Sequence, residues 1–199
     1  MRFSIKHLLI AVLAVGILFA TYVTWMRDAV TISDAPHDEE IHTDYYFGID
    51  EPSEIQNILN ISGVFKKRTR LSAGLYLVSN GNFESINGFT VGRSTNRVGE
   101  PWLMTMKLTF ALGEKNGKTG TLTQLGCYGH TRGGGGSGYL ENNVDKKFTK
   151  TYNGTMTPGN DLIVYVAGSK QFDLEPNQTI EDFAKTNSGE YLVIVSSLH

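Results

Sequence analysis

The chain has 199 residues, of which 40% are hydrophobic and 11% aromatic, and its formal net charge is −2. This composition excludes a wholly disordered chain, because enough apolar side chains are present to bury a core. The single cysteine, Cys127, excludes a disulfide framework or a thiolate metal cluster built within one chain. We expect Cys127 to be a small buried apolar side chain, with pairing to a second chain as the alternative.

Nineteen residues without a charged side chain, Leu8 to Met26, follow a basic start that contains Arg2 and Lys6. A helix of this length reaches about 28 Å, close to the ~30 Å hydrocarbon core of a bilayer. The segment predicts an uncleaved single-pass transmembrane helix (a signal anchor), represented by Leu8, Val12, Gly16, Phe19 and Trp25. A cleaved leader, which would release a secreted protein, and a helix of a soluble domain are the alternatives.

Charge then divides the rest of the chain. Nine acidic residues and no Lys or Arg lie in 28–54, whereas 55–199 holds fifteen basic and eleven acidic residues, a net of +4. We expect a cytoplasmic tail and anchor in 1–27, an acidic linker in 28–54 and an extracytoplasmic β-rich domain in 55–199. The linker is interpreted as a solvated tether, with a strap docked on the basic domain as the alternative. In a bacterium this domain is periplasmic or exposed outside the cell.

The linker and the residues after it contain a pair of histidines, a capping box and a cluster of basic residues. His37 and His42 are five residues apart, whereas a zincin helix needs a spacing of four, so no metal site is predicted beyond weak divalent binding. A helix is predicted from a Ser53/Gln56 capping box to Ser62-Gly63, with Ile55, Ile58 and Leu59 on one face. The basic residues Lys66, Lys67, Arg68 and Arg70 that follow are interpreted as a solvated strand start, and nucleic acid is not a predicted partner.

The remaining pattern is that of β-strands. Apolar residues occupy every second position from Trp102 to Leu112, Asn116-Gly117 suits a tight hairpin turn, and 119–127 is the return strand. Leu122 and Leu125 are out of phase, which predicts a bulge. Further strands are expected at 75–78 and 88–91, separated by the turn 79–82.

Near the C-terminus, the apolar runs 162–166 and 191–195 predict strands covered on both faces. Between them, Thr179 caps a short helix whose Ile180, Phe183 and Ala184 point inward, and 187–189 end it. The predicted fold class is therefore mainly β: an N-terminal transmembrane helix, then a compact antiparallel β-sandwich or open barrel with one or two short helices.

The run Arg2-Phe3-Ser4-Ile5-Lys6-His7-Leu8-Leu9-Ile10-Ala11-Val12 resembles the start of many uncharacterised planctomycete membrane-anchored proteins. The stretches 163–168 and 179–184 look like the tail of the same group. The resemblance implies a membrane address and a lineage, and it carries no activity.

Candidate chemistry is confined to 127–138. The motif at 113–119 has three residues between its glycines, where a phosphate loop needs four, and is interpreted as a hairpin turn. In 127–138, backbone amides and Arg132 could bind an anion and His130 could titrate near neutral pH, whereas a flexible connection is the favoured interpretation. The candidate ligand residues are Tyr128, His130, Arg132, Gly133, Gly134, Gly135 and Gly136.

No catalytic residue, metal or cofactor is predicted. The favoured hypothesis is a membrane-anchored binding or structural module of the cell envelope, whose partners are the lipid bilayer, through 8–26, and an envelope protein or glycan. The alternative is a small ligand-binding or hydrolytic domain that uses His130 and Arg132.

Overall fold

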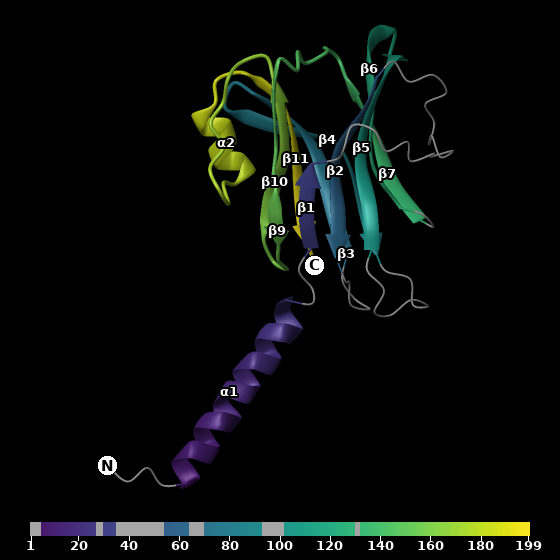
Figure 1. The fold of residues 1–199 in the computed structure, drawn as a ribbon. Helices are drawn as coiled ribbons and strands as arrows, with labels where there is room; N and C mark the ends of the chain where they lie inside the picture. The colour runs from purple at the N-terminus through teal and green to yellow at the C-terminus, as the bar shows by residue number, and fades with distance from the viewer. Residues whose placement is uncertain (1–4, 27–29, 35–53, 64–69, 93–101, 130–131) are drawn as a thin grey trace.

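In the computed structural model, the described residues are 5–26, 30–34, 54–63, 70–92, 102–129 and 132–199. Helix α1 (Ile5–Met26) lies outside the two sheets (Figure 1) and contains one segment, Ile5–Val23, that is long and apolar enough to cross a membrane. Its large apolar side chains from Ile5 to Tyr22 are exposed, with Leu8, Val12 and Phe19 at 62–66%. Gly16 lies mid-helix and Trp25 in the last turn. The predicted N-terminal apolar helix is confirmed, and it begins three residues earlier than expected.

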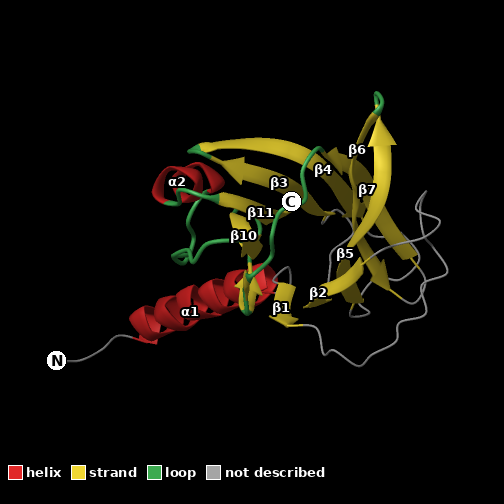
Figure 2. Ribbon diagram, turned by 90° about the horizontal axis from the view of Figure 1, so that it is seen from above, coloured by secondary structure: helices red, strands yellow, loops and turns green. Residues whose placement is uncertain are grey.

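The remaining described strands form two antiparallel sheets (Figures 1 and 2), which confirms the mainly β prediction. The six-stranded sheet contains, in spatial order, β7 (Arg132–Leu140), β6 (Lys118–Gly129), β5 (Trp102–Lys115), β2 (Glu54–Gly63), β1 (Val30–Asp34) and β9 (Gly154–Met156). The five-stranded sheet contains β4 (Asn82–Gly92), β3 (Arg70–Ser79), β11 (Glu190–Leu198), β10 (Asp161–Gly168) and β8 (Phe148–Thr151).

The main core lies between the sheets, and the hairpin β5–β6 shows how the sequence builds it. Met106 and Leu108 are fully buried and Phe110 is nearly so, as the alternation predicts. Asn116 and Gly117 have φ of 56° and 76°, the left-handed values that a type I′ turn requires. The turns at Asn80-Gly81 and Asn116-Gly117 are therefore both confirmed.

The bulge predicted in the return strand is wrong. β5 and β6 pair in unbroken register from Met104 opposite Gly129 to Lys115 opposite Lys118. Leu122 lies on the face opposite Leu125 and covers Gly113, where an added Cβ would overlap the Leu122 side chain. An apolar residue that shields a cross-strand glycine breaks the sequence pattern without breaking the ladder.

A second apolar cluster lies on the outer face of the five-stranded sheet, beneath α2 (Ile180–Thr186; Figure 2). Thr179 accepts a hydrogen bond from the Asp182 backbone N–H and caps the helix, and Asn187 is its C-cap. The main core covers one face of β10 and β11, and α2 covers the other. Residues that point to either face are therefore buried, which explains the continuous apolar runs of these two strands. The predicted capped helix and the two strands covered on both faces are confirmed. Within the described residues, α2 is the one short helix of the domain.

The helix predicted from Ser53 to Gly63 is wrong, because Glu54–Gly63 form β2. β2 pairs with β5, and its register shifts by one residue between Asn57 and Leu59. The resulting bulge turns both Ile58 and Leu59 into the core, at 4% and 0% exposed. Two adjacent inward residues disturb the period of two, so the apolar spacing resembles that of a helix.

The expected linker also contains a strand. β1 pairs with β2 on one side and with β9 on the other, and Val30 and Ile32 are fully buried. The acidic residues between β1 and β2 lie outside the described residues, as do His37 and His42. The interpretation of 28–54 as a tether is thus wrong for residues 30–34, which form part of the folded sheet.

Strand direction places particular segments near the end of α1. Val30 lies opposite Gly63 and Met156, so β1 begins where β2 and β9 end. The C-terminus lies at the same end of the domain (Figure 1), where His199 and Arg70 exchange two backbone hydrogen bonds of 2.8 and 2.9 Å. The α2 helix lies towards the opposite end (Figure 1).

Candidate functional site

The glycine-rich segment forms an edge strand rather than a flexible connection. Residues 132–140 form β7, which pairs with β6 from Gly129 opposite Arg132 to Thr121 opposite Leu140. The interpretation of 132–138 as a flexible loop is therefore wrong. The physical reason is packing between strands that lie far apart in the sequence.

The glycines of β7 allow two strand backbones to approach each other. An added Cβ at Gly136 would overlap the carbonyl oxygen of Gly88 in β4, and one at Gly134 would lie 3.1 Å from Val91 Cγ2. Across the same region, Asn87 Nδ2 donates hydrogen bonds to the carbonyl oxygen and to Oγ1 of Thr123, at 3.2 and 3.0 Å. The glycines thus close one side of the domain, because side chains there would force β4 and β7 apart.

The predicted ligand residues are only partly described. Tyr128 is 7% exposed and its ring lies over Gly126 and Gly133, where an added Cβ would contact ring atoms. Gly133 to Gly136 belong to β7. His130 and the Arg132 side chain lie outside the described residues, so an anion or hydrolytic site there stays a prediction.

The other residues singled out by the sequence have structural positions. Cys127 is fully buried in the core, and this burial raises the pKa of its thiol, as expected for an inert apolar side chain. Arg70 is the exposed first residue of β3, whereas Lys66, Lys67 and Arg68 lie outside the described residues. Within the described part of the chain, no three His, Cys, Asp or Glu side chains are grouped as metal ligands.

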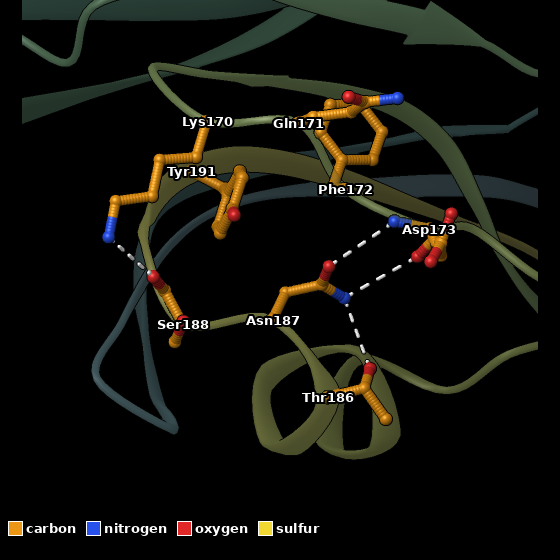
Figure 3. Close-up of a pocket in the computed structure, with 8 residues that line it drawn as sticks. All are labelled: Lys170, Gln171, Phe172, Asp173, Thr186, Asn187, Ser188 and Tyr191. Carbon is orange, nitrogen blue, oxygen red and sulfur yellow. Dashed lines mark hydrogen bonds between the residues drawn. The ribbon is translucent and has the colours of Figure 1, made fainter.

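Two concavities lie on the outer face of the five-stranded sheet. The first, the α2 pocket, has a volume of about 360 Å³ and is bounded by the segments before and after α2 (Figure 3). Its lining residues are Lys170, Gln171, Phe172, Asp173, Thr186, Asn187, Ser188 and Tyr191.

Three side chains of the α2 pocket, Lys170, Thr186 and Asn187, are hydrogen-bonded within the protein. The Asn187 amide accepts from the Asp173 backbone N–H at 3.3 Å and donates to Thr186 Oγ1 at 3.0 Å (Figure 3). It also donates to the Phe183 carbonyl at 3.0 Å. Lys170 Nζ donates to the Ser188 carbonyl at 3.0 Å. These bonds join the end of α2 to the loop that precedes it.

The second concavity, the β3–β4 hollow, has a volume of about 440 Å³. Its lining residues are Ser72, Ala73, Gly74, Tyr76, Ser85, Asn87, Gly88, Phe89, Thr90, Asp161, Val195 and Ser197. This hollow was not predicted from the sequence. A signal was present, since small or hydroxyl-bearing residues alternate with Leu71, Ala73 and Leu75 along β3.

Strand pairing aligns the hollow's residues in rows that run across the sheet. Asp161, Ser197, Ser72 and Thr90 lie opposite one another in β10, β11, β3 and β4. The next row on the outer face of the sheet consists of Ile163, Val195, Gly74 and Gly88. The pair Tyr76 and Ser85 lies beyond that row. The hollow thus has a polar border, a glycine floor and an aromatic border.

Comparisons with protein-family models, curated proteins and solved structures found no match to this chain. The resemblance to planctomycete anchored proteins therefore stays a prediction.

Proposed function

We propose that the chain is a single-pass membrane protein of the cell envelope whose β domain is a binding module outside the cytoplasm. The observation that carries the proposal is α1, a helix of 22 residues whose apolar segment Ile5–Val23 has no buried residue. Apolar surface in water costs roughly 25 cal/mol per Å². A bilayer removes this cost, and the helix length of about 33 Å matches its hydrocarbon core.

The connection between α1 and β1 fixes where the domain lies in this proposal. Four Cα–Cα steps lead from Met26 to Val30, which reach at most about 15 Å. The end of the domain that holds Val30 and the C-terminus is then next to the lipid headgroups. Arg2 and Lys6, at the N-terminal end of the apolar segment, favour a cytoplasmic N-terminus, which leaves the β domain outside.

Binding is favoured over a purely structural role by the unused polar groups of the β3–β4 hollow. Within the described part of the chain, the hydroxyls of Tyr76 and Ser85 have no protein hydrogen-bond partner. A concavity that combines apolar or aromatic surface with a few polar groups is the usual form of a binding site, and the hollow combines Tyr76 and Val195 with such hydroxyls.

The membrane proposal is tested by placing charges in α1. Leu13→Arg with Leu18→Arg adds two charges near the middle of the helix, at roughly 2.5–3.5 kcal/mol each. We expect the wild type to stay in the membrane pellet after alkaline carbonate extraction and the double variant to move to the supernatant. Leu112→Arg is the matched control, because Leu112 is 80% exposed in the β domain. Equal membrane retention of the double variant and the wild type would contradict the proposal.

Topology and cleavage need two further measurements. Protease added to intact spheroplasts should digest the β domain, whereas protection would place that domain in the cytoplasm. The intact mass of the purified protein should include α1. A mass that corresponds to a chain beginning near residue 21 would instead establish a cleaved leader and a secreted protein.

A further inference from the structure

The β3–β4 hollow is on the half of the outer sheet face closer to α1. Its polar row includes Asp161, the first residue of β10, and Ser197, the penultimate residue of β11, and both strand ends lie at the α1 end of the domain. The α2 helix covers the other half. In the membrane-anchored arrangement proposed above, the hollow opens sideways near the lipid surface.

The floor of the hollow depends on two residues without side chains. An added Cβ at Gly74 would lie 2.8 Å from Tyr76 Cε2 and 3.0 Å from its hydroxyl oxygen, so the Tyr76 ring extends over Gly74. An added Cβ at Gly88 would lie 2.9 Å from the Ala73 carbonyl oxygen. The two glycines therefore leave a shallow floor with an aromatic ring at one side.

Hydroxyl groups surround this floor. Ser72 Oγ and Thr90 Oγ1 are 3.1 Å apart, and the Ser197 hydroxyl donates to the Asp161 carboxylate. Each hydroxyl has one donor and two acceptor sites, so these pairs keep hydrogen-bonding capacity for a ligand. Ser85 and the Tyr76 hydroxyl add two further groups on the opposite side.

The charges of the lining select among ligand classes. Among the described lining residues there is no Lys, Arg or His, and Asp161 is the one charged side chain. Phosphate and nucleic-acid ligands are recognised mainly by cationic groups, so this lining disfavours them. A neutral ligand with an apolar face and many hydroxyls fits an aromatic ring that lies beside serine and threonine.

We propose that the β3–β4 hollow binds a neutral glycan, with one sugar ring stacked on Tyr76 and its hydroxyls hydrogen-bonded to the polar row. This inference rests on the proposed binding function and names its ligand class. The carboxylate of Asp161 accepts hydrogen bonds from sugar hydroxyls, and the four aligned strands favour an extended chain over a single sugar. Because the hollow is shallow, binding is weak for one sugar and increases with chain length.

The test measures sugar binding by the full chain in phospholipid nanodiscs, because sugar-based detergents would compete. Saturation-transfer NMR is recorded with two neutral probes, N-acetylglucosamine tetramer and maltotetraose, and with inorganic phosphate. We expect transfer to at least one tetrasaccharide, strongest on its C–H protons, and none to phosphate. Transfer to neither tetrasaccharide would overturn the proposal, as would a stronger response to phosphate.

Variants then locate the bound sugar. Thr90→Val removes one hydroxyl at nearly constant volume and should weaken binding roughly 2- to 10-fold, as expected for one lost hydrogen bond. Ser85→Trp should fill the hollow and abolish binding. The matched controls are Thr119→Val and Ser137→Trp, at exposed positions of β6 and β7 in the other sheet. Equal weakening by the controls would place the sugar elsewhere and overturn the proposal.

The outcomes separate this inference from the membrane proposal. Protein that binds a tetrasaccharide but leaves the membrane in carbonate would support the hollow and contradict the anchor. Protein that stays in the membrane but binds neither tetrasaccharide would contradict the hollow alone.

Discussion

The outer face of the five-stranded sheet has two halves, and they differ in what covers them. Beneath α2, Phe172, Phe183 and Tyr191 pack edge to face with centroid distances of 5.4–5.9 Å. In the other half, a row of hydroxyls and a pair of glycines line the β3–β4 hollow. The same strands contribute to both halves. The difference shows that the outward side chains, rather than the strands, decide which part of a sheet is buried and which stays open.

Tyr76 connects the two halves. Its ring packs against the apolar cluster beneath α2 and contacts Phe83 edge to face at 6.1 Å. The same ring borders the hollow over Gly74. We therefore expect changes beneath α2 to act mainly on stability, and changes in the hollow to act mainly on binding.

The largest loss of stability is expected from Phe183→Ala, which removes a ring from the apolar cluster beneath α2. Phe183 is fully buried, and removal of a buried phenylalanine ring costs about 3–5 kcal/mol. Denaturant unfolding of the full chain measures the loss of stability. Phe148→Ala is the matched control, because Phe148 is 37% exposed on the edge strand β8. Equal losses in the two variants would show that α2 is not packed as described.

A smaller loss is expected from Asn187→Ala. Asn187 is 7% exposed, and its removal leaves the Phe183 carbonyl and the Asp173 backbone N–H without their amide partner. Loss of such buried hydrogen bonds costs about 1–3 kcal/mol. The same unfolding measurement is compared with Asn153→Ala, at an exposed loop position. An unchanged midpoint for Asn187→Ala would show that the α2 pocket is not held together by this amide.

The elements predicted correctly are those that local chemistry specifies. Thr179 and Asp182 define the start of α2, and Asn-Gly pairs define two hairpin turns. The apolar runs in β10 and β11 indicate cover on both faces, although they do not identify what provides it. These signals need only a few neighbouring residues, so the sequence contains them in full.

The wrong predictions have non-local causes. The bulge at Ile58 is defined by pairing with β5, and β1 becomes a strand because β2 and β9 lie on either side of it. The glycines of β7 have no periodic pattern, and their role appears only once β4 lies against them. The hollow likewise needs the pairing of four strands, which aligns Asp161 with Thr90 across 71 positions of sequence.

A loss of about 1 kcal/mol in the free energy of unfolding is expected from Thr179→Ala, which removes the N-cap side chain of α2. Thr179 Oγ1 accepts from the Asp182 backbone N–H at 3.2 Å, and removal of an N-cap side chain typically has this cost. Thr179→Ser retains the acceptor and should restore the stability. Failure of the serine variant to do so would indicate that the methyl group, rather than the cap, stabilises α2.

The smallest change in stability is expected from Gly74→Ala, at the border between the hollow and the half of the sheet that α2 covers. The added methyl group must displace the Tyr76 ring, whose nearest atoms are 2.8–3.1 Å away, whereas replacing glycine in a strand gains about 0.5–1 kcal/mol. The two effects oppose each other, so we expect the free energy of unfolding to change by less than about 1 kcal/mol. The Tyr76 resonances should nevertheless move and tetrasaccharide binding should weaken. Gly92→Ala is the matched control, because a Cβ there would lie 3.7 Å from Arg70 Cγ, an ordinary contact. If Gly74→Ala and Gly92→Ala bind the tetrasaccharide equally well, the position of the Tyr76 ring does not matter to the hollow, and its role as a stacking surface is contradicted.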